Sequence, residues 1–191
     1  MMKKDLESYI KVYNVLDKKT CFEIVKDLKT KTWSEHRFYN FHKKEGVKLS
    51  GKNELDTCWG NDQFIHYDNI MKKIWDTLHI YYYKDLNFSW LPGWNGYTQL
   101  RFNRYQKNKK MAHHWDCINS MFDGERKGIP TLSIVGNLNE NYIGGKFIMF
   151  KDKEIKLKTG DFLMFPSTFL YPHKVEPVTK GTRYTFVSWV W

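Results

Sequence analysis

Apolar residues repeat with helical spacing in two stretches of the first half of the chain. Residues 18–29 follow Asp17, a residue type that commonly caps helix N-termini, and predict the first helix. A longer helix is expected over about residues 63–83, with an apolar stripe that should lie on a sheet. Residues 8–16 and 33–42 alternate apolar and polar side chains, and predict two short strands. The members of the stripe are Ile65, Tyr67, Ile70, Ile74, Trp75, Leu78 and Tyr82.

The pattern changes near Tyr97 to short extended runs separated by Gly, Asn, Asp and Pro. Such runs are typical of a sandwich or barrel of antiparallel strands. Gly144-Gly145 and Thr159-Gly160-Asp161 predict turns, whereas residues 45–62, rich in Gly, Lys and Asn, predict a loop. We therefore expect a mainly β protein with supporting helices. Its architecture should be a double-stranded β-helix, a jelly-roll or cupin-like barrel with N-terminal helices packed on one sheet.

Length and composition favour a single domain. A chain of 191 residues is long enough for one substantial core and short for two. We expect residues 1–95 to form a helix-containing support and residues 96–191 to form the barrel. Aromatic residues make up 17% of the chain, and this bulk favours a packed β-rich interior over a disordered chain. A monomer is the expected state.

Cysteine usage and hydropathy point to a reducing compartment and away from a membrane. No apolar run approaches the roughly 20 residues of a membrane span, and the N-terminus leads into no signal-type segment. Cys21, Cys58 and Cys117 show no Cys-x-x-Cys spacing, so a disulfide framework is not expected. The expected location is the cytoplasm, that of the host in the case of a viral protein.

The formal net charge of +10 raises the question of nucleic-acid binding. The lysines are dispersed along the chain, which is more typical of a solvated surface than of a binding groove. The charge does predict a preference for acidic partners.

A His-x-Asp motif offers candidate metal ligands. His114 and Asp116 share one face of an extended strand, while Trp115 points away and His113 lies on the wrong face to join Asp116. Taken alone, the two residues could be a buried pair without a metal. With a second histidine, His173, they would complete the facial triad of non-haem Fe(II) oxygenases, which leaves coordination positions open for an oxo acid and O₂.

Arg183 lies ten residues after His173, in a run where Arg183, Thr185, Val187 and Trp189 share one face. A guanidinium that points into a barrel is costly when unpaired and favourable once a carboxylate binds it through two hydrogen bonds. A surface arginine in a salt bridge is the alternative. Cys117, which faces away from the ligands, is expected to serve packing.

These motifs stand in an order that resembles the 2-oxoglutarate/Fe(II) dioxygenases, in particular the prolyl-hydroxylase branch with its small viral, phage and bacterial members. The resemblance covers roughly the C-terminal half of the chain, and its most specific part is the closing run from His173 to Arg183 and on to Trp189. The other pieces are Arg104-Tyr105, His114-Trp115-Asp116, Thr131-Leu132-Ser133-Ile134 before Leu138-Asn139, Gly144-Gly145-Lys146-Phe147, Lys158-Thr159-Gly160-Asp161 and Phe165-Pro166.

The resemblance implies a role for each site residue. His114, Asp116 and His173 would hold Fe(II), and 2-oxoglutarate would chelate the metal and place its distal carboxylate on Arg183. O₂ is the second co-substrate, with ascorbate as a candidate stimulant. The residues expected to line the co-substrate pocket or to lie near the metal are Tyr105, Ser133, Asn137 with Thr131 on the same face, and Trp189. Tyr105 and Trp189 could equally serve the fold.

The function implied is hydroxylation of an unactivated C–H bond, with release of succinate and CO₂. The first substrate choice is a prolyl residue of a protein, ahead of free amino acids. Oxidative demethylation of nucleic acid is one alternative, although that branch usually carries a second arginine shortly after the first. A non-catalytic binding barrel is another, which the complete triad with Arg183 disfavours. Residues 43–62 and 120–130 are the loops expected to grip the substrate.

Overall fold

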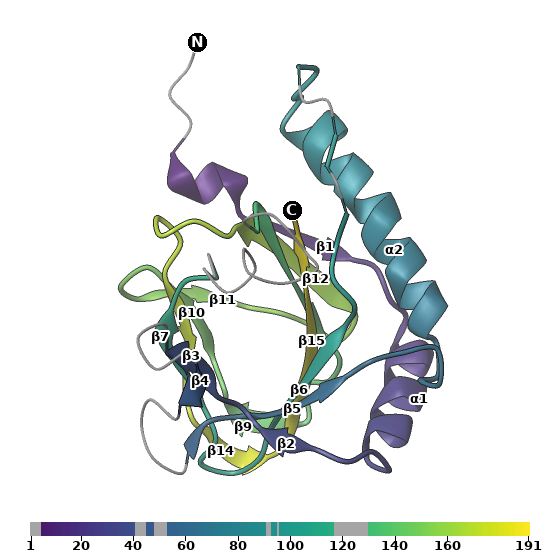
Figure 1. Cartoon of the computed structure of the whole chain (residues 1–191), viewed down its shortest axis with the longest axis vertical. Coiled ribbons are helices and arrows are strands. Elements are labelled where there is room, and N and C mark those ends of the chain that lie inside the picture. The colour runs from purple at the N-terminus through teal and green to yellow at the C-terminus, as the bar shows by residue number, and fades with distance from the viewer. Residues whose placement is uncertain (1–4, 41–44, 48–52, 91–92, 95, 117–129) are drawn as a thin grey trace.

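The computed structural model shows two antiparallel sheets that face each other, with helices outside the larger one (Figure 1). It describes residues 5–40, 45–47, 53–90, 93–94, 96–116 and 130–191, and for residues 38–40 and 45–47 the backbone alone. The larger sheet has seven strands in the order β1-β12-β8-β15-β6-β5-β2. Their bounds are β1 Lys11–Asn14, β12 Asp161–Pro166, β8 Leu132–Asn137, β15 Arg183–Val190, β6 Arg101–Tyr105, β5 Asp56–Trp59 and β2 Ser34–Glu35.

The smaller sheet has four strands in the order β11-β10-β13-β7, and the pairs β14-β9 and β3-β4 form two further sheets of two strands each. The predicted double-stranded β-helix is confirmed, as two facing sheets and not as a closed barrel. The remaining bounds are β11 Lys153–Ile155, β10 Phe147–Met149, β13 His173–Val175, β7 Met111–His114, β14 Val178–Gly181, β9 Tyr142–Gly144, β3 Phe38–Asn40 and β4 Glu45–Val47.

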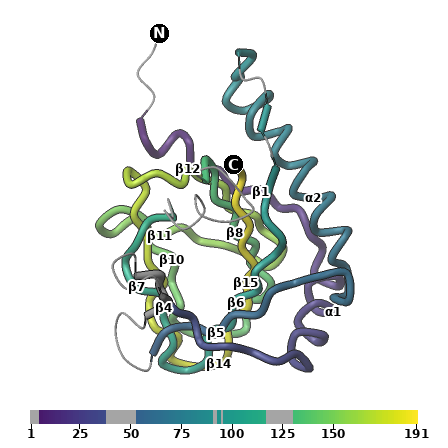
Figure 2. Tube along the Cα trace, in the orientation of Figure 1, coloured from purple at the N-terminus to yellow at the C-terminus, as the bar shows by residue number. Residues whose placement is uncertain are grey.

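The larger sheet is buried on both faces. Every residue of its central strands β8 and β15 is buried. One face packs against the smaller sheet, where Val135, Leu163 and Val187 meet Phe147 and Val175. The helices cover the other face, as Figure 2 shows. The apolar residues of this second core include Ile24, Leu28, Ile70, Ile74 and Leu78 from the helices and Phe102, Ile134, Phe162 and Phe186 from the sheet.

The two predicted helices are present with shifted ends. Helix α1 spans Lys18–Leu28, and the Asp17 carboxylate caps it by accepting a 2.8 Å hydrogen bond from the backbone N–H of Thr20. Helix α2 spans Tyr67–His79 and continues as a π-helical segment, η3, over Ile80–Asp85. A short 3₁₀ helix, η1, covers Leu6–Tyr9 at the start of the first predicted strand. No helix in the described part of the chain has the length and hydropathy of a membrane span.

Two local predictions were wrong. Residues 45–62 are not a plain loop, because β4 pairs with β3 and β5 pairs with β6 over four residues. These segments are extended because they hydrogen-bond to a partner strand. A hydrophobic pattern within the segment does not predict such pairing. In the predicted stripe, Ile65 and Trp75 are 44% and 47% exposed. Trp75 instead packs on Trp94, with ring centroids 5.1 Å apart.

Gly136 is expected to be irreplaceable in the centre of the larger sheet. A Cβ atom there would lie 2.0 Å from Cε1 of the buried Phe186. Gly136→Ala should therefore lower the free energy of unfolding in a urea titration by about 1–3 kcal/mol or more, as overpacking does. Ile143→Ala is the control, because Ile143 is 60% exposed. A change within about 0.5 kcal/mol, as at ordinary surface sites, would mean that Phe186 moves aside at little cost.

Candidate active site

Three potential metal ligands meet where β7 and β13 pair. His114 ends β7 and lies directly opposite His173, which begins β13. Asp116 follows two residues later, and its carboxylate oxygens lie 3.4 Å from Nε2 of His114 and 3.8 Å from Nε2 of His173. All three ligand atoms fall within 4.8 Å of one another. The structure thus brings the predicted triad together, and its donor set suits a divalent first-row metal.

Backbone carbonyls orient both imidazoles. His114 Nδ1 lies 2.7 Å from the carbonyl oxygen of Ala112, and His173 Nδ1 lies 3.1 Å from that of Tyr171. A carbonyl can only accept a hydrogen bond, so each Nδ1 must carry a proton. In the neutral ring the lone pair then sits on Nε2, the atom nearest to Asp116. This arrangement is the usual way in which proteins fix the tautomer of a metal-binding histidine.

The electrostatics of the triad favour metal-binding protonation states. Burial alone would raise the pKa of Asp116, but His173, His114 and the Ser133 hydroxyl outweigh it and hold this pKa below its usual range. Burial lowers the pKa of His173 to about 4, against the opposing pull of Asp116. His173 also lies between the rings of Phe147 and Phe165, at centroid distances of 5.2 and 5.0 Å. At neutral pH the site offers a carboxylate and a neutral imidazole.

Acid is expected to destabilise the metal-free protein through His173. Its pKa is about 4 in the folded chain against an ordinary value of 6.5. Between these values the unfolded chain binds the proton and the folded chain does not, so stability falls as the pH drops. The free energy of unfolding should decrease by on the order of 3 kcal/mol between pH 7 and pH 4 from this group. Urea titrations of the metal-free protein across this range measure it.

His173→Gln should flatten this pH dependence. His113→Gln should change it only slightly, because His113 is exposed and is the smallest of the influences on the pKa of His173. An equally steep loss of stability in His173→Gln would assign the acid sensitivity to other groups.

Arg183 is a buried guanidinium that no acidic side chain of the described residues neutralises. It is 1% exposed, and its Nε donates a 3.2 Å hydrogen bond to the hydroxyl oxygen of Tyr142. Its Cζ lies 5.1 Å from the ring centroid of Tyr105. Within the described residues, Nη1 of Arg183 and the hydroxyl of Thr185 are buried without a hydrogen-bond partner. A buried, unpaired cation is costly unless a ligand completes it.

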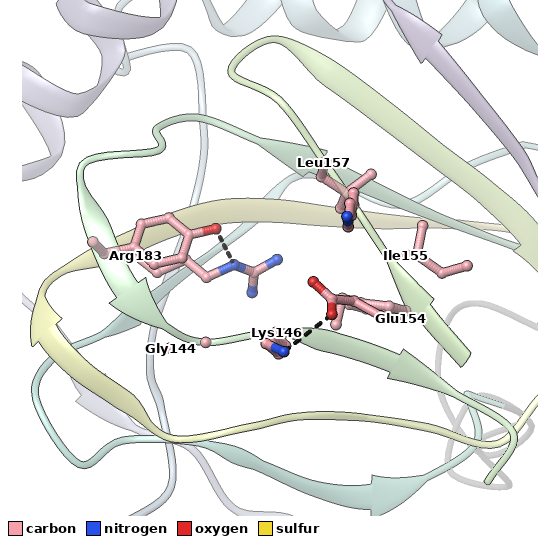
Figure 3. A pocket seen from close by; sticks show the side chains of 10 residues that line it. Gly144, Lys146, Glu154, Ile155, Leu157 and Arg183 are labelled. Atoms are coloured by element: carbon pink, nitrogen blue, oxygen red, sulfur yellow. Dashed lines mark hydrogen bonds and ion pairs between the residues drawn. The ribbon is translucent and has the colours of Figure 1, made fainter. Parts of the chain in front are cut away.

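Arg183 reaches two adjoining cavities. One, of about 30 Å³, contains the triad and is lined by both sheets, including Tyr105, Thr185 and Trp189. The other, of about 160 Å³, lies beside β9, β10 and β11. Figure 3 shows the guanidinium of Arg183 pointing into this second cavity. Gly145 makes room there, because a Cβ atom at this position would come within 3.2 Å of Cδ of Arg183. The position is thus suited to an anionic ligand.

The other predicted pocket residues occupy different positions. Tyr105 is 3% exposed, and burial raises the pKa of its hydroxyl, which therefore stays protonated and able to donate. The Ser133 hydroxyl pairs with that of Ser167 at 2.8 Å, and Nε1 of Trp189 is buried without a partner among the described residues. Asn137 lines neither cavity, because its amide donates to the backbone carbonyls of residues 139, 157 and 158.

Several expectations fall outside the cavity or outside the described residues. Thr131 is exposed and lies just before β8, so it does not share the inward face of that strand. Trp115 is 53% exposed, as expected for the residue between two ligands. Cys117 and the segment 120–129 lie outside the described residues.

Sequence reasoning gave no role to three polar residues of the triad cavity. Arg101 and Asn103 line it beside Tyr105, and Thr185 lines it beside Arg183. Two-residue alternation along β6 and β15 could have found them, since each shares a face with a residue already selected.

Comparison with known proteins shows which of them this chain is similar to. Residues 100–191 match the 2OG-Fe(II) oxygenase superfamily. A PKHD-type hydroxylase of Aliarcobacter butzleri is 38% identical over 97 residues, which cover 47% of this chain and 41% of the relative. One of Crocosphaera subtropica is 35% identical over 96 residues, with 48% and 41% covered. The chain therefore spans less than half the length of these curated relatives.

Solved structures with the same fold include two prolyl hydroxylases. One, from Trichoplax adhaerens in complex with a peptide fragment of the hypoxia inducible factor oxygen degradation domain, has a TM-score of 0.72 at 18% identity and covers 96% of this chain and 84% of its own. The viral collagen prolyl hydroxylase of Paramecium bursaria Chlorella virus-1 has a TM-score of 0.64 at 15% identity, with 95% and 94% covered. The predicted resemblance to 2-oxoglutarate/Fe(II) dioxygenases is confirmed over residues 100–191, and the likeness to prolyl hydroxylases is one of fold.

Proposed function

We propose, from the match of residues 100–191 to the 2OG-Fe(II) oxygenase superfamily, that this chain is an Fe(II)- and 2-oxoglutarate-dependent dioxygenase. It hydroxylates an unactivated C–H bond and releases succinate and CO₂. One observation carries the proposal: the triad of His114, Asp116 and His173 shares a cavity with Arg183, a buried cation that no acidic side chain of the described residues neutralises. A metal site beside an anion site is what a chelating dicarboxylate requires.

Different residues of the chain would bind the two ends of 2-oxoglutarate. His114, Asp116 and His173 would hold Fe(II), and a set of three protein ligands would leave coordination positions for the oxo and carboxylate oxygens of 2-oxoglutarate. Arg183 would bind the distal carboxylate, with Tyr105 and Thr185 close enough to the same cavity to donate hydroxyl hydrogen bonds. Bound Fe(II), 2-oxoglutarate and O₂ supply the oxidation of the C–H bond.

The protein contributes orientation and exclusion of water more than acid–base chemistry. Phe147, Phe165 and Trp189 surround the triad with apolar surface. At pH 7 Asp116 stays ionised and His173 neutral, the protonation states that a metal requires of these ligand types.

The substrate class we propose is a prolyl residue in a protein or peptide. The support is the likeness in fold to prolyl hydroxylases, one of which is solved with a peptide bound. Cys21 and Cys58 are free thiols, which fits work in a reducing cytoplasm, and we expect a monomer.

The test is succinate formation by the purified protein with Fe(II), 2-oxoglutarate and O₂, followed by mass spectrometry of a proteome incubated with it. The expected result is a mass increase of one oxygen on proline-containing peptides. Methylated single-stranded DNA oligomers serve as the comparison substrate. Demethylation without peptide hydroxylation would show that the substrate is nucleic acid and not a peptide. Absence of succinate under all conditions would overturn the proposed activity.

A further inference from the structure

A second arginine, Arg101, faces the triad cavity. It begins β6, and the two-residue alternation of that strand places Arg101, Asn103 and Tyr105 on one face. All three line the cavity that contains the triad. Arg101 is half-buried, and burial lowers the pKa of its guanidinium while the charge of Asp116 raises it.

Strand register sets Arg101 and Arg183 apart along the cavity. In the antiparallel pair of β6 and β15, Tyr105 lies opposite Arg183, whereas Arg101 lies opposite Val187. Four residues of strand correspond to about 13 Å. Arg183 therefore serves one end of the cavity and Arg101 the other, so a single small dicarboxylate anchored at Arg183 and at the metal does not also engage Arg101.

The contacts of Arg101 leave its terminal nitrogens available. Its Nε donates a 3.2 Å hydrogen bond to Asn103 Oδ1, and its Cζ lies 4.8 Å from the ring centroid of Trp189. Such stacking fixes the plane of a guanidinium. Among the described residues, no carboxylate lies within ion-pair distance of Arg101, and its two terminal nitrogens make no hydrogen bond.

The charges in the cavity would not balance once the metal and 2-oxoglutarate are bound. The two positive charges of a divalent metal would be balanced by Asp116 and by one carboxylate of 2-oxoglutarate. The charge of Arg183 would be balanced by the other carboxylate. Burial holds the pKa of the nearby His36 at about 3, so this group adds no positive charge at pH 7. Glu54 is a buried carboxylate whose charge acts on Tyr105, but it does not line this cavity, and its Oε2 accepts a hydrogen bond from the backbone N–H of Ala112. Among the charged groups that line the cavity, Arg101 is then the one left without a counterion.

We propose that Arg101 binds a carboxylate of the substrate that is oxidised. The inference rests on the proposed function and narrows it: the substrate is a proline-containing peptide that carries a carboxylate close to the oxidised residue. That carboxylate comes either from an aspartate or glutamate side chain or from the C-terminus of the peptide. Arg101 is thus a specificity-determining residue, and the stack on Trp189 holds its planar fork in place for two parallel hydrogen bonds.

A panel of short blocked peptides tests the proposal and separates the two sources of the carboxylate. One pair places aspartate or asparagine next to a central proline, and the other pair ends in proline as a free acid or as an amide. Succinate formation above the peptide-free rate and hydroxyproline by mass spectrometry are measured for each. The proteins are the wild type, Arg101→Gln, Arg101→Lys and Lys107→Gln, which removes an exposed charge beyond the same strand.

The wild type should prefer the acid over its neutral partner in at least one pair, on the order of tenfold to a hundredfold in kcat/KM. Arg101→Gln should lose this preference, Arg101→Lys should keep part of it, and Lys107→Gln should retain it. The free energy of unfolding of Arg101→Gln in a urea titration should stay close to that of the wild type, which shows that the fold is intact. Lys107→Gln, outside the cavity, should keep the peptide-free rate and the KM for 2-oxoglutarate.

Failure of this inference differs from failure of the proposed function. Succinate formation by the wild type without any preference for acidic peptides, or a preference that survives in Arg101→Gln, overturns the role of Arg101 alone. If neither Arg101→Gln nor Arg101→Lys folds with a stability close to that of the wild type, Arg101 serves the fold and the inference is wrong. No succinate from the wild type in any condition overturns the proposed function itself.

Discussion

Replacing Arg183 with alanine is expected to raise the apparent KM for 2-oxoglutarate by about two to three orders of magnitude. A bidentate, charge-assisted contact to a carboxylate is among the stronger polar interactions. Its removal also leaves a buried carboxylate unpaired, a loss of roughly 3 to 5 kcal/mol in all. At about 1.4 kcal/mol per tenfold change, this loss gives the expected KM. The measurement is a 2-oxoglutarate titration of both proteins at saturating Fe(II).

Three comparisons sharpen this experiment. Iron affinity should change little, because the chain places Arg183 outside the group of three ligands. Arg183→Lys should recover part of the loss, since it keeps the charge but gives up the planar fork. Tyr142→Phe, which removes only the hydroxyl that accepts from Nε of Arg183, should have a much smaller effect. An unchanged KM in Arg183→Ala, or a defect confined to iron binding, would show that the co-substrate is held elsewhere.

Replacing His114 or His173 with alanine is expected to abolish both iron binding and turnover. In the proposed site each supplies one of three protein ligands among the described residues, and the loss of one would leave the metal to solvent and to competing sites. His113→Ala is a matched control, because His113 is the exposed neighbour of His114 in β7. It should bind iron and form succinate at close to the wild-type rate.

Iron binding is measured directly by metal titration, so that the ligand role is separated from any effect on catalysis. Near wild-type succinate formation in His114→Ala or His173→Ala would mean that the triad assignment is wrong. Asp116→Ala can retain weak binding through the two imidazoles and is the less decisive variant.

The geometry of the triad could be anticipated because it follows from short-range rules. Alternation along one strand puts His114 and Asp116 on the same side and sends Trp115 outward, and the structure agrees. Buried positions of α2 such as Ile70, Ile74 and Leu78 follow from helical spacing in the same way.

Features that depend on partners distant in sequence were missed or misjudged. Strand β5 exists because β6 hydrogen-bonds to it, and its own sequence gives little signal. Asn137 shares a face with Ser133, but its side-chain amide donates hydrogen bonds to the backbone carbonyls of residues 157 and 158. Arg101 gains its significance from the stack on Trp189, nearly ninety residues away. None of these relations can be derived from alternation within one segment.

The order of strands in the larger sheet has a consequence for how the chain folds. The central strand β15 is the last strand of the chain, and β1 pairs with β12, where Lys11 lies opposite Met164, about 150 residues away. Contacts so distant in sequence predict slow folding, on the millisecond to second scale. During synthesis one edge of β8 and one edge of β6 stay unpaired until β15 has been made and can pair with both. Unpaired strand edges can associate with other chains. High-level expression should therefore benefit from low temperature or chaperones, because the aggregation-prone interval ends only when the strand that carries Arg183 has been made.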